Sequence, residues 1–387
     1  MANTETVKGF GEYTGIEAAK RQRIKGILAN IFKTYGFELS ETPIIEFEEF
    51  VRGDNENDEA VSDVFRLEDK GKRKLALRYE FTFQLKRIAS NKKLPYKRYQ
   101  IGEVFRDEPT TGNRFRQFTQ CDVDTVGSTI KEEAEILAIA SEIMKELGIK
   151  ATIYVNNRKL LNEIMDEQKI DEKIRKEVIR EIDKLDKLSE KEVKDNLKKY
   201  KAEKVLEIFQ KPEKYFEKYK AYAEIKELEE YCKMYSVKIN FLPSLARGLS
   251  YYNGSVFEVK TTEMKETICG GGSYMVNGIQ ATGISFGLER LYQLAKVSID
   301  DRKVLLISIG KDKETLKLAE EIRKEGVACA VLYGKVSKAL EYANSYSIPY
   351  VIFIGDDEVK KKKFLLKNMK TGKEDLVTSE QIVKRIV

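Results

Sequence analysis

Apolar positions between residues 14 and 36 recur at helical spacing and predict one amphipathic helix. The residues of its apolar face are Ile24, Ile27, Leu28, Ile31, Phe32 and Tyr35. Thr14 and Glu17 have the spacing of a capping box, and Gly36 provides a C-terminal stop. The segment that follows, FELSETPIIEF, is predicted to be extended around Pro43.

Alternating apolar and polar residues replace the helical spacing between residues 63 and 126. Four runs are typical of strands: DVFRLED, LALRYE, RYQIGEVFRDE and FRQFTQCDVDTV. Polar or glycine-containing stretches join them in pairs, which favours two hairpins, and a helix over residues 81–91 is predicted between the pairs. A second capped helix is predicted from Thr129, with Glu132 at capping-box spacing, to Gly148. ATIYV then forms a short strand.

The pattern changes between residues 157 and 236, which are rich in Lys and Glu and helical in period. We therefore predict a helical insertion here. Strand-like segments resume with VKINFLP, SVFEVKT and TICGGGSYM, and a helix over 288–296 closes the unit. Residues 1–156 and 237–298 are thus expected to form one α+β domain with an antiparallel sheet.

A polar hinge from Asp300 to Lys303 precedes the tail of the chain. Residues 302–387 alternate buried-looking strands with helices, which predicts a parallel or mixed α/β domain. The basic run from Lys360 to Lys363 suits either contact with RNA phosphates or a solvated turn, and both interpretations stay open.

The composition is typical of a globular protein, with 42% hydrophobic and 35% charged residues in 387. No apolar run is long enough to span a bilayer, and the N-terminus lacks a signal-peptide pattern. The 4 cysteines are scattered and form no C-x-x-C pair, which argues against a zinc site and a disulfide framework. We therefore expect a cytoplasmic protein. The net charge of +6 is mildly favourable for nucleic acid and decides nothing alone.

The chain contains 0 histidines. A Ser-His-Asp triad, histidine-ligated zinc and histidine general-base catalysis are therefore excluded. Any chemistry must depend on Arg, Glu, Asp, Gln, Tyr, a metal ion or the substrate itself. Compositional bias, engineering and selection would each account for this absence.

Two arginines on opposite sides of the insertion carry the strongest chemical signal. Arg106 and Glu108 lie in GEVFRDE, and Arg290 lies in ISFGLER. Each arginine stands near a carboxylate among alternating apolar residues, and an arginine fork matches phosphate geometry. The pattern predicts a nucleotide clamp on an antiparallel sheet.

The stretch TGNRFRQFTQCDVD adds polar residues at strand spacing. Thr111 to Asn113 are predicted to form a flexible turn. Arg114 and Arg116 are two residues apart and are expected to share a face suited to phosphates. Gln120, Asp122 and Asp124 are likewise expected to share one face of the strand.

The ordered set GEVFRDE, LARGLSYYNG and ISFGLER resembles the histidyl-tRNA synthetases, a family of class II aminoacyl-tRNA synthetases. The form QCDVD resembles the archaeal and eukaryotic branch of that family. The resemblance covers nearly the whole chain and implies a class II synthetase fold. It also implies a homodimer interface ending at Pro43, an insertion that holds the tRNA acceptor stem and a C-terminal anticodon-binding domain. A solvated helix surface is the alternative for the insertion.

The resemblance implies ATP binding by residues on both sides of the insertion. These are Arg106, Glu108, Arg114, Phe118 and Arg290. Arg106 would bind the α-phosphate and stabilise charge as pyrophosphate leaves, and Phe118 would stack on adenine. Arg247 is the other implied catalytic residue, a cation near the reacting carboxylate and the α-phosphate.

A second implied set binds histidine. Its members are Glu80, Thr82, Gln120, Asp124, Tyr251 and Tyr252. Glu80 and Thr82 would surround the ammonium and carboxylate ends, and Gln120 would bind the amino group. Asp124 would accept a hydrogen bond from the imidazole, whose ring nitrogens can donate. The two tyrosines would wall the side-chain pocket.

Three positions depart from the family's pattern. Ser250 stands where Asp is usual, which alters a contact behind the pocket. Ser273 and Met275 stand where the motif G-G-R-Y-D has Arg and Asp, which alters the glycine-rich loop and bears on substrate affinity.

The resemblance implies that histidine and ATP form histidyl-adenylate and that the acyl group then passes to tRNA(His). Mg²⁺ would bridge the phosphates, without a metal site built from the protein alone. Because histidine is absent, we expect few protein groups to titrate near neutral pH. The alternative is a non-catalytic, histidine-binding regulatory subunit of histidine biosynthesis. The changed GGSYM loop favours it, whereas the clamp arginines and the C-terminal domain argue against it.

Overall fold

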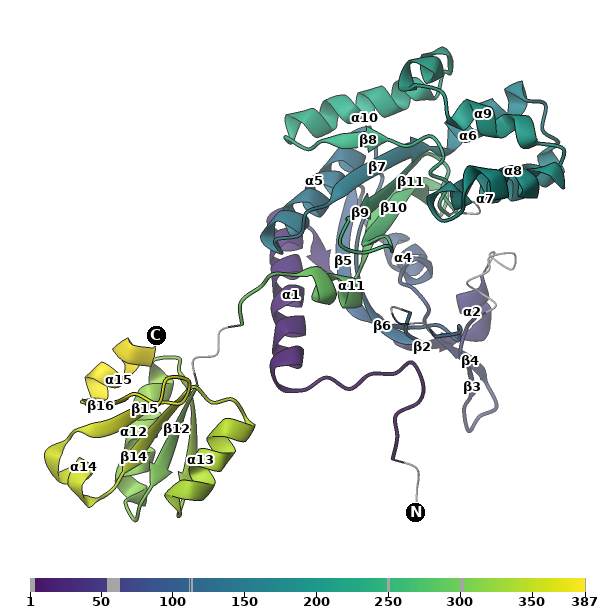
Figure 1. Ribbon diagram of the computed structural model, residues 1–387. Coiled ribbons are helices and arrows are strands. Elements are labelled where there is room, and N and C mark those ends of the chain that lie inside the picture. The colour runs from purple at the N-terminus through teal and green to yellow at the C-terminus, as the bar shows by residue number, and fades with distance from the viewer. Residues whose placement is uncertain are drawn as a thin grey trace. The chain divides into compact units, whose positions relative to one another are not determined.

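The computed structural model describes residues 4–53, 63–110, 112, 114–248, 251–299 and 303–386. The chain divides into two units, Met1–Val297 and Ser298–Val387, which are treated separately below (Figure 1). Thr111, Asn113, Ser250 and the start of the predicted hinge, Asp300, lie outside the described residues.

An 8-stranded sheet is the centre of the first unit. Its strands in spatial order are β1 (Glu38–Leu39), β5 (Tyr96–Phe105), β6 (Gln117–Val126), β11 (Ile279–Gly287), β10 (Cys269–Val276), β9 (Ser255–Lys260), β7 (Thr152–Asn157) and β8 (Ile239–Phe241). The strands from β5 to β7 pair antiparallel, as predicted. The edge strands β1 and β8 pair parallel with their neighbours, so the complete sheet is mixed.

Helices α1 (Gly15–Thr34) and α5 (Ile130–Glu146) cover one face of this sheet. Leu28 and Phe32 of α1 are fully buried, and the Phe32 ring centroid lies 5.3 Å from that of Tyr99 and 6.2 Å from that of Phe286. In β6 the buried residues Cys121 and Val123 point to the same covered face. The alternate residues of β6 must therefore point to the opposite face.

The helix ends test the capping predictions directly. Thr129 and Glu132 form the predicted capping box. Gly36 has a φ of 79° and ends α1 with the hydrogen bond from Phe37 N–H to Phe32 O, as predicted. The capping box predicted at Thr14 is wrong, because the Thr14 side chain makes no capping bond. Gly15, the first helical residue, has a φ of 53°, so this helix does not begin with the regular backbone that a capping box requires.

A 3-stranded antiparallel sheet lies beside the main one. It contains β2 (Ile45–Phe47), β4 (Lys74–Leu77) and β3 (Arg66–Glu68), followed along the chain by α4 (Thr82–Ala89); α2 (Glu48–Arg52) follows β2. Both predicted hairpins are present, since β3 pairs with β4 and β5 pairs with β6.

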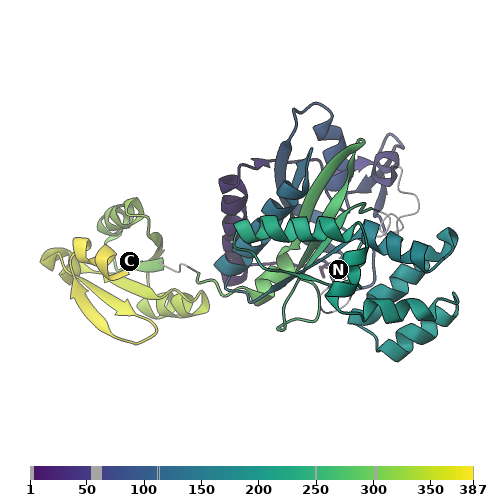
Figure 2. The same cartoon turned by 90° about the horizontal axis from the view of Figure 1, so that it is seen from above.

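The Lys- and Glu-rich stretch is helical, as its periodicity predicts. It contains α6 (Arg158–Glu167), α7 (Glu172–Asp183), η1 (Lys184–Asp186), α8 (Glu190–Lys198), η2 (Glu203–Val205), α9 (Leu206–Phe209), η3 (Glu213–Lys218) and α10 (Tyr222–Met234). Its apolar residues Ile164, Ile182 and Leu228 belong to the same buried cluster as residues of the sheet. Helix α10 lies beside α5 (Figures 1 and 2). Helix α11 (Leu288–Leu294) closes the unit after β11.

The second unit is a mixed α/β fold, as predicted. Its strands in spatial order are β13 (Ala328–Tyr333), β12 (Lys303–Ser308), β14 (Tyr350–Ile354), β15 (Phe364–Asn368) and β16 (Glu374–Val377), and its helices are α12 (Asp312–Lys324), α13 (Val336–Ser345), α14 (Asp356–Lys361) and α15 (Ser379–Ile386). The first three strands are parallel and the last two antiparallel. No helix in the described parts of the chain has the length and apolar character needed to cross a membrane.

Candidate active site

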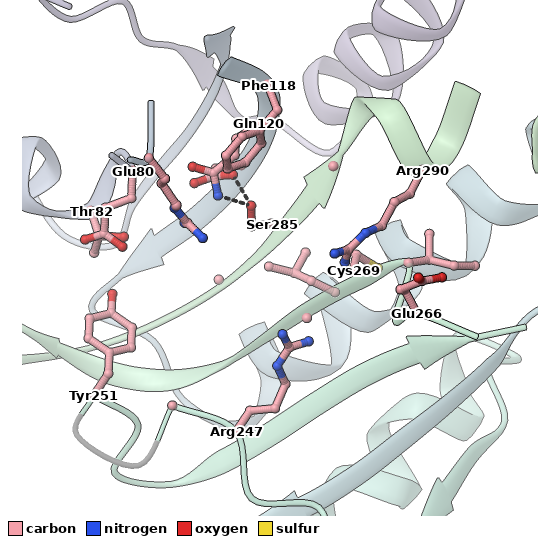
Figure 3. A pocket seen from close by; sticks show the side chains of 18 of the residues that line it. Glu80, Thr82, Phe118, Gln120, Arg247, Tyr251, Glu266, Cys269, Ser285 and Arg290 are labelled. Carbon is pink, nitrogen blue, oxygen red and sulfur yellow. Dashed lines mark hydrogen bonds between the residues drawn. The ribbon is translucent and has the colours of Figure 1, made fainter. Parts of the chain in front are cut away.

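A pocket of about 670 Å³ opens on the face of the main sheet that α1 and α5 leave uncovered. Its wall includes the residues that the resemblance assigned to ATP, to histidine and to catalysis: Glu80, Thr82, Arg106, Glu108, Arg114, Phe118, Gln120, Asp124, Arg247, Tyr251, Tyr252 and Arg290. Figure 3 shows Arg247, Gln120 and Glu80 converging on it from different elements. The structure therefore brings the predicted residues together, while their individual roles stay predictions.

The floor of the pocket is formed by β6 and β11. Gln120, Asp122 and Asp124 alternate along β6 and all line the pocket, as their spacing predicts. Gly283 pairs with Asp124 across the two strands. A Cβ atom on Gly283 would lie 2.1 Å from Asp124 Oδ1, so only glycine leaves the carboxylate in place.

One wall carries Arg106 and Arg114. Arg106 follows the end of β5; its Nε donates to Tyr79 O at 3.2 Å and its guanidinium lies 5.2 Å from the Phe118 ring centroid. The Arg114 guanidinium pairs with the Glu108 carboxylate. A cation beside an aromatic face is suited to a nucleotide, whose base can stack while its phosphates meet the arginines.

The prediction that Arg116 shares this face with Arg114 is wrong. Arg116 pairs with Asp107 and its guanidinium lies 4.8 Å from the Phe65 ring centroid, outside the pocket lining. The regular alternation of β6 begins only at Gln117, so spacing of two residues does not place both arginines on one side.

The opposite wall carries Arg247 and Arg290. Arg290 Nη1 donates to Thr267 O at 2.6 Å. Burial, followed by the charge of Arg247, lowers the pKa of Arg290. Arginine remains charged under any ordinary condition, so two cations held close together here favour a polyanionic ligand.

Arg247 is held by a chain of ion pairs that begins in the helical stretch. Its Nη1 lies 2.9 Å from Glu258 Oε1, and Lys260 Nζ lies 2.8 Å from Glu258 Oε2 and 3.3 Å from Asp186 Oδ2. Asp183 Oδ1 accepts the N–H of Ala246 at 2.9 Å. Two acidic residues from the helical stretch thus fix the segment that presents the arginine.

The remaining wall is aromatic. The Tyr251 ring stacks on the Tyr274 ring with centroids 4.7 Å apart, and Tyr252 meets Tyr251 edge-on at 5.0 Å. The Tyr251 hydroxyl points toward Thr82 and Glu80 (Figure 3). This corner combines flat aromatic surfaces with a carboxylate, which suits a small aromatic ligand that carries an ammonium group.

Asp124 already has protein partners. The Tyr274 hydroxyl donates to Asp124 Oδ1, and Arg98 Nη2 lies 3.0 Å from Asp124 Oδ2. Arg98 is 1% exposed, so its charge is compensated almost entirely by this carboxylate and its neighbours. Any contact between Asp124 and an imidazole must share the carboxylate with these two groups.

Several pocket residues were missed from the sequence. Tyr274 lies in the GGSYM run that was singled out only for its changed neighbours, and Ser285 lies within ISFGLER, the run that was singled out only for Arg290. Glu266 also lines the pocket beside Arg290. The residues around Arg98 in the sequence do not indicate its role, because Arg98 meets Asp124 only through the pairing of β5 with β6.

One carboxyl group is an exception among the few protein groups expected to titrate near neutral pH. Burial, followed by the neighbouring charge of Asp124, raises the pKa of Asp122 to about 7. The Asp122 carboxyl is 6% exposed and accepts a hydrogen bond from the Ser285 hydroxyl at 2.5 Å. Burial therefore keeps the Asp122 carboxyl protonated to a higher pH than an exposed carboxyl.

A largely antiparallel sheet with opposed arginines over one pocket is the arrangement of a class II aminoacyl-tRNA synthetase. The family model described as Histidyl-tRNA synthetase matches residues 9–291, and the one described as Anticodon binding domain matches residues 303–387. The chain belongs to the histidyl-tRNA synthetase family.

Individual relatives agree over nearly the full length. The chain is 34% identical to "Histidine--tRNA ligase 1" of Bacillus cereus, covering 97% of each protein. It is also 34% identical to "Histidine--tRNA ligase 2" of Shouchella clausii, over 96% of this chain and 98% of that protein.

Solved structures agree as well. The histidyl-tRNA synthetase from Nostoc sp. PCC 7120 matches with a TM-score of 0.86 and 25% identity over 100% of both chains. A structure titled an ATP phosphoribosyltransferase regulatory subunit/histidyl-tRNA synthetase, from Bacillus halodurans C, matches with a TM-score of 0.76 at 19% identity, over 91% of this chain and 99% of that one. At that identity the second match reflects the shared fold alone.

Proposed function

We propose that this protein activates histidine with ATP and transfers it to tRNA(His). The observation that carries the proposal is the single pocket in which phosphate-binding arginines lie opposite a carboxylate and tyrosines. A regulatory subunit that only binds histidine has no need for Arg106 and Arg290 in one pocket, so the catalytic function is favoured.

We assign Arg106 and Arg290 to the phosphates of ATP, with Glu108 and Arg114 beside them and Phe118 against adenine. Arg106 and Arg247 stabilise the charge that develops at the α-phosphate when the histidine carboxylate attacks it. No side chain acts as a general base, because a carboxylate nucleophile needs none. Positioning and charge stabilisation supply the acceleration.

The histidine side of the pocket comprises Glu80, Thr82, Gln120, Asp124, Tyr251 and Tyr252. Glu80 and Gln120 would receive the ammonium group, and the tyrosines would enclose the imidazole. Asp124, held by Tyr274 and Arg98, would accept from a ring N–H. Tyr274 is added to the set because its ring stacks on Tyr251 and its hydroxyl meets Asp124.

Pyrophosphate exchange into ATP, measured with each amino acid in turn, tests the proposal. We expect exchange with histidine and little with the others. Exchange driven by another amino acid, with none for histidine, would overturn the substrate assignment. Histidine binding without any exchange would instead favour the regulatory alternative.

We propose that ATP enters with Mg²⁺. The residues fit such an ion: Mg²⁺ takes one or two protein carboxylates together with phosphate and water, and Glu108 and Glu266 line the phosphate side. Among the described residues there is no group of three or more metal-ligating side chains that could hold a metal by themselves. Bound to ATP, Mg²⁺ neutralises phosphate charge.

We propose that tRNA approaches over the helical stretch. A second cavity of about 1010 Å³ shares Arg247 and Arg290 with the pocket, and both basic and acidic residues of the helical stretch line it, among them Lys184, Lys187 and Glu181. Lys184 pairs with Glu181 at 2.7 Å, and Lys187 lies at the border with the pocket. Cationic side chains beside the reaction site suit the phosphates at the 3′ end of tRNA. The Anticodon binding domain match supports assigning the anticodon contact to the C-terminal unit.

A charge-reversing substitution distinguishes tRNA binding from the adenylation step. Lys184→Glu should weaken aminoacylation of tRNA while leaving pyrophosphate exchange unchanged, since adenylation needs no tRNA. Lys173→Glu, a reversal on the same helical stretch outside both cavities, is the control. Equal aminoacylation by both variants would contradict this approach path.

We also propose a cytoplasmic homodimer. Apolar side chains around the predicted interface are 43–54% exposed: Leu39, Ile44, Ile45 and Phe47. Such a group of exposed apolar side chains marks a protein interface.

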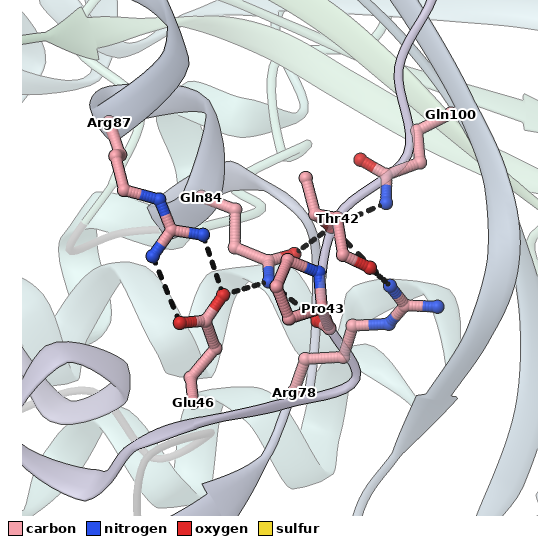
Figure 4. Close-up of polar contacts among 7 residues, drawn as sticks. All are labelled: Thr42, Pro43, Glu46, Arg78, Gln84, Arg87 and Gln100. Carbon is pink, nitrogen blue, oxygen red and sulfur yellow. Dashed lines mark hydrogen bonds and ion pairs between the residues drawn. The ribbon is translucent and has the colours of Figure 1, made fainter.

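The backbone that carries this surface is held from within (Figure 4). Arg78 Nη1 donates to Thr42 O at 2.8 Å, and Gln84 Nε2 donates to Pro43 O at 2.8 Å. Arg87 pairs with Glu46 at 2.7 Å. The apolar side chains are therefore presented on a rigid segment, as a preformed interface requires.

Light scattering at micromolar concentration tests the assembly. The wild type should be a dimer and Ile45→Glu should be a monomer. Leu376→Glu changes a 63%-exposed apolar residue of the C-terminal unit and should leave the dimer intact. A monomeric wild type that retains activity would contradict the proposal.

A further inference from the structure

Three side chains on the pocket floor form a directed hydrogen-bond chain. Gln120 Nε2 donates to Ser285 Oγ at 2.8 Å, and the Ser285 hydroxyl donates to Asp122 Oδ1 at 2.5 Å (Figure 3). Ser285 lies directly opposite Asp122 in the pairing of β11 with β6, and Gln120 lies two residues earlier on the same face. The strand register therefore places the serine between the two β6 side chains.

We propose that Asp122 orients Gln120 through Ser285, so that the Gln120 carbonyl faces the substrate's α-ammonium group only while Asp122 is ionised. Asp122 is a positioning residue in this scheme and need not touch the substrate. The inference rests on the proposed function, in which Gln120 receives the amino group of histidine.

The direction of the chain follows from the number of protons. An ionised carboxylate can only accept, so the one hydroxyl proton of Ser285 is used on Asp122. Ser285 can then only accept from Gln120, which engages the amide nitrogen. Gln120 Oε1 is left buried and without a hydrogen-bond partner among the described residues. A buried acceptor without a partner is costly, and a substrate ammonium would satisfy it.

Protonation of Asp122 reverses the chain. The carboxylic acid then donates to Ser285, and Ser285 donates its own proton to the Gln120 oxygen. The amide turns over and presents its N–H groups to the ammonium, so that two donors face each other. An attractive contact is thereby replaced by a repulsive one, and affinity for the amino acid falls.

The groups around Asp122 shift its protonation toward neutral pH. Burial and then Asp124 raise the pKa of Asp122, to about 7, against the lowering effects of Arg98 and Ser285. The titratable and charged groups that face Asp122 are Asp124 on the same strand, Arg98 on β5, Glu80 ahead of α4 and Tyr252 beside the pocket. Cys121 is adjacent in the chain but points to the covered face. The charges of Arg98 and Asp124 have opposite effects on the pKa of Asp122, so burial is the main reason why this pKa is raised.

Titration of histidine binding at pH 6 and pH 8 tests the inference, with wild type and Asp122→Asn compared at each pH. The asparagine cannot ionise, and its oxygen can still accept from Ser285. Ionisation of the substrate affects both proteins equally and cancels in the ratio of their dissociation constants. Wild-type affinity should fall relative to the variant between pH 8 and pH 6, by up to about tenfold, because only the ionised form of Asp122 orients Gln120 for the ammonium group. A constant ratio would overturn the proposal.

A substrate analogue distinguishes an indirect role of Asp122 from direct contact with the imidazole. Imidazolepropionate keeps the ring and the carboxylate but lacks the amino group. Its ratio should stay constant with pH, because Gln120 has no ammonium to meet. If the ratio of dissociation constants for imidazolepropionate changes with pH as it does for histidine, Asp122 acts on the imidazole ring directly. The proposed relay from Asp122 through Ser285 to Gln120 is then wrong.

Further variants control for folding and for unrelated carboxyl groups. Ser285→Ala, like Asp122→Asn, should lack the part of the pH dependence of histidine binding that Asp122 causes in the wild type. Ser285→Thr keeps a hydroxyl and should show the wild-type pH dependence. If Asp122→Asn does not fold, the comparison of these two Ser285 variants tests the proposal. Glu133→Gln removes another buried carboxyl with a raised pKa and should keep the wild-type pH profile. Failure of wild type to bind histidine at any pH would reject the proposed function itself, whereas binding with a constant ratio would reject only the relay.

Discussion

Replacement of Arg247 by alanine should slow adenylate formation far more than it weakens ATP binding. Arg247 lines both cavities, and the proposed function places its guanidinium beside the α-phosphate, where charge would develop. Loss of one preorganised donor of this kind costs roughly 100- to 1000-fold in rate, or about 2.7–4 kcal/mol. Because the contact strengthens in the transition state, the dissociation constant of ATP should change much less.

The ion pairs around Arg247 predict that this variant stays folded. Arg247 is partly exposed, and its buried partner Glu258 keeps Lys260 at 2.8 Å after the arginine is removed. The free energy of unfolding should therefore change by less than about 1 kcal/mol. Arg247→Lys keeps the charge without the bidentate fork and should recover only part of the rate.

Single-turnover adenylate formation, with ATP binding measured separately, distinguishes the two effects. Arg175→Ala is a matched control, because it removes an arginine paired with Asp166 on the helical stretch and outside both cavities. It should retain the wild-type rate. A folded Arg247→Ala protein with a near-wild-type rate would show that the assigned role is wrong.

Three further outcomes are expected. Gly283→Ala places a Cβ atom 2.1 Å from Asp124 Oδ1 and should raise the KM for histidine at least about tenfold in pyrophosphate exchange. Gly26→Ala in α1 is the control, because its Cβ atom meets nothing within 4 Å and KM should not change. Arg98→Met leaves the Asp124 charge buried without the cation that lies 3.0 Å from it. The free energy of unfolding, measured by urea titration, should fall by about 3–5 kcal/mol. A loss below about 1 kcal/mol would show that this ion pair does not stabilise the fold. Removal of Mg²⁺ with a chelator should abolish exchange and added Mg²⁺ should restore it, so activity that persists in chelator would reject the magnesium proposal.

Much of the scaffold could be predicted from local patterns. The apolar spacing of α1, the capping box of α5 and the two hairpins follow from backbone geometry over a few residues. The two-residue period of β6 likewise placed Gln120 and Asp124 on one face. Motif order then indicated that residues far apart in the chain would share a pocket, which they do.

The same local rules were wrong where an element had not yet begun. Spacing of two residues predicted a common face for Arg114 and Arg116, but both precede β6, and Arg116 instead meets Asp107 and Phe65. Thr14 and Glu17 have the spacing of a capping box, yet Thr14 makes no capping bond, and Gly15 beside it has a φ outside the helical region. Periodicity is informative only within a regular element.

The sequence by itself determined which residues of β6 share the pocket face, because side-chain direction alternates along a strand. Only the tertiary structure decided what those side chains do to one another. The pairing of Ser285 with Asp122, and of Arg98 with Asp124, depends on the register between strands distant in the chain. The raised pKa of Asp122 depends on burial by elements that surround it on every side. Register and burial are properties of non-local contacts, so no window of sequence contains them.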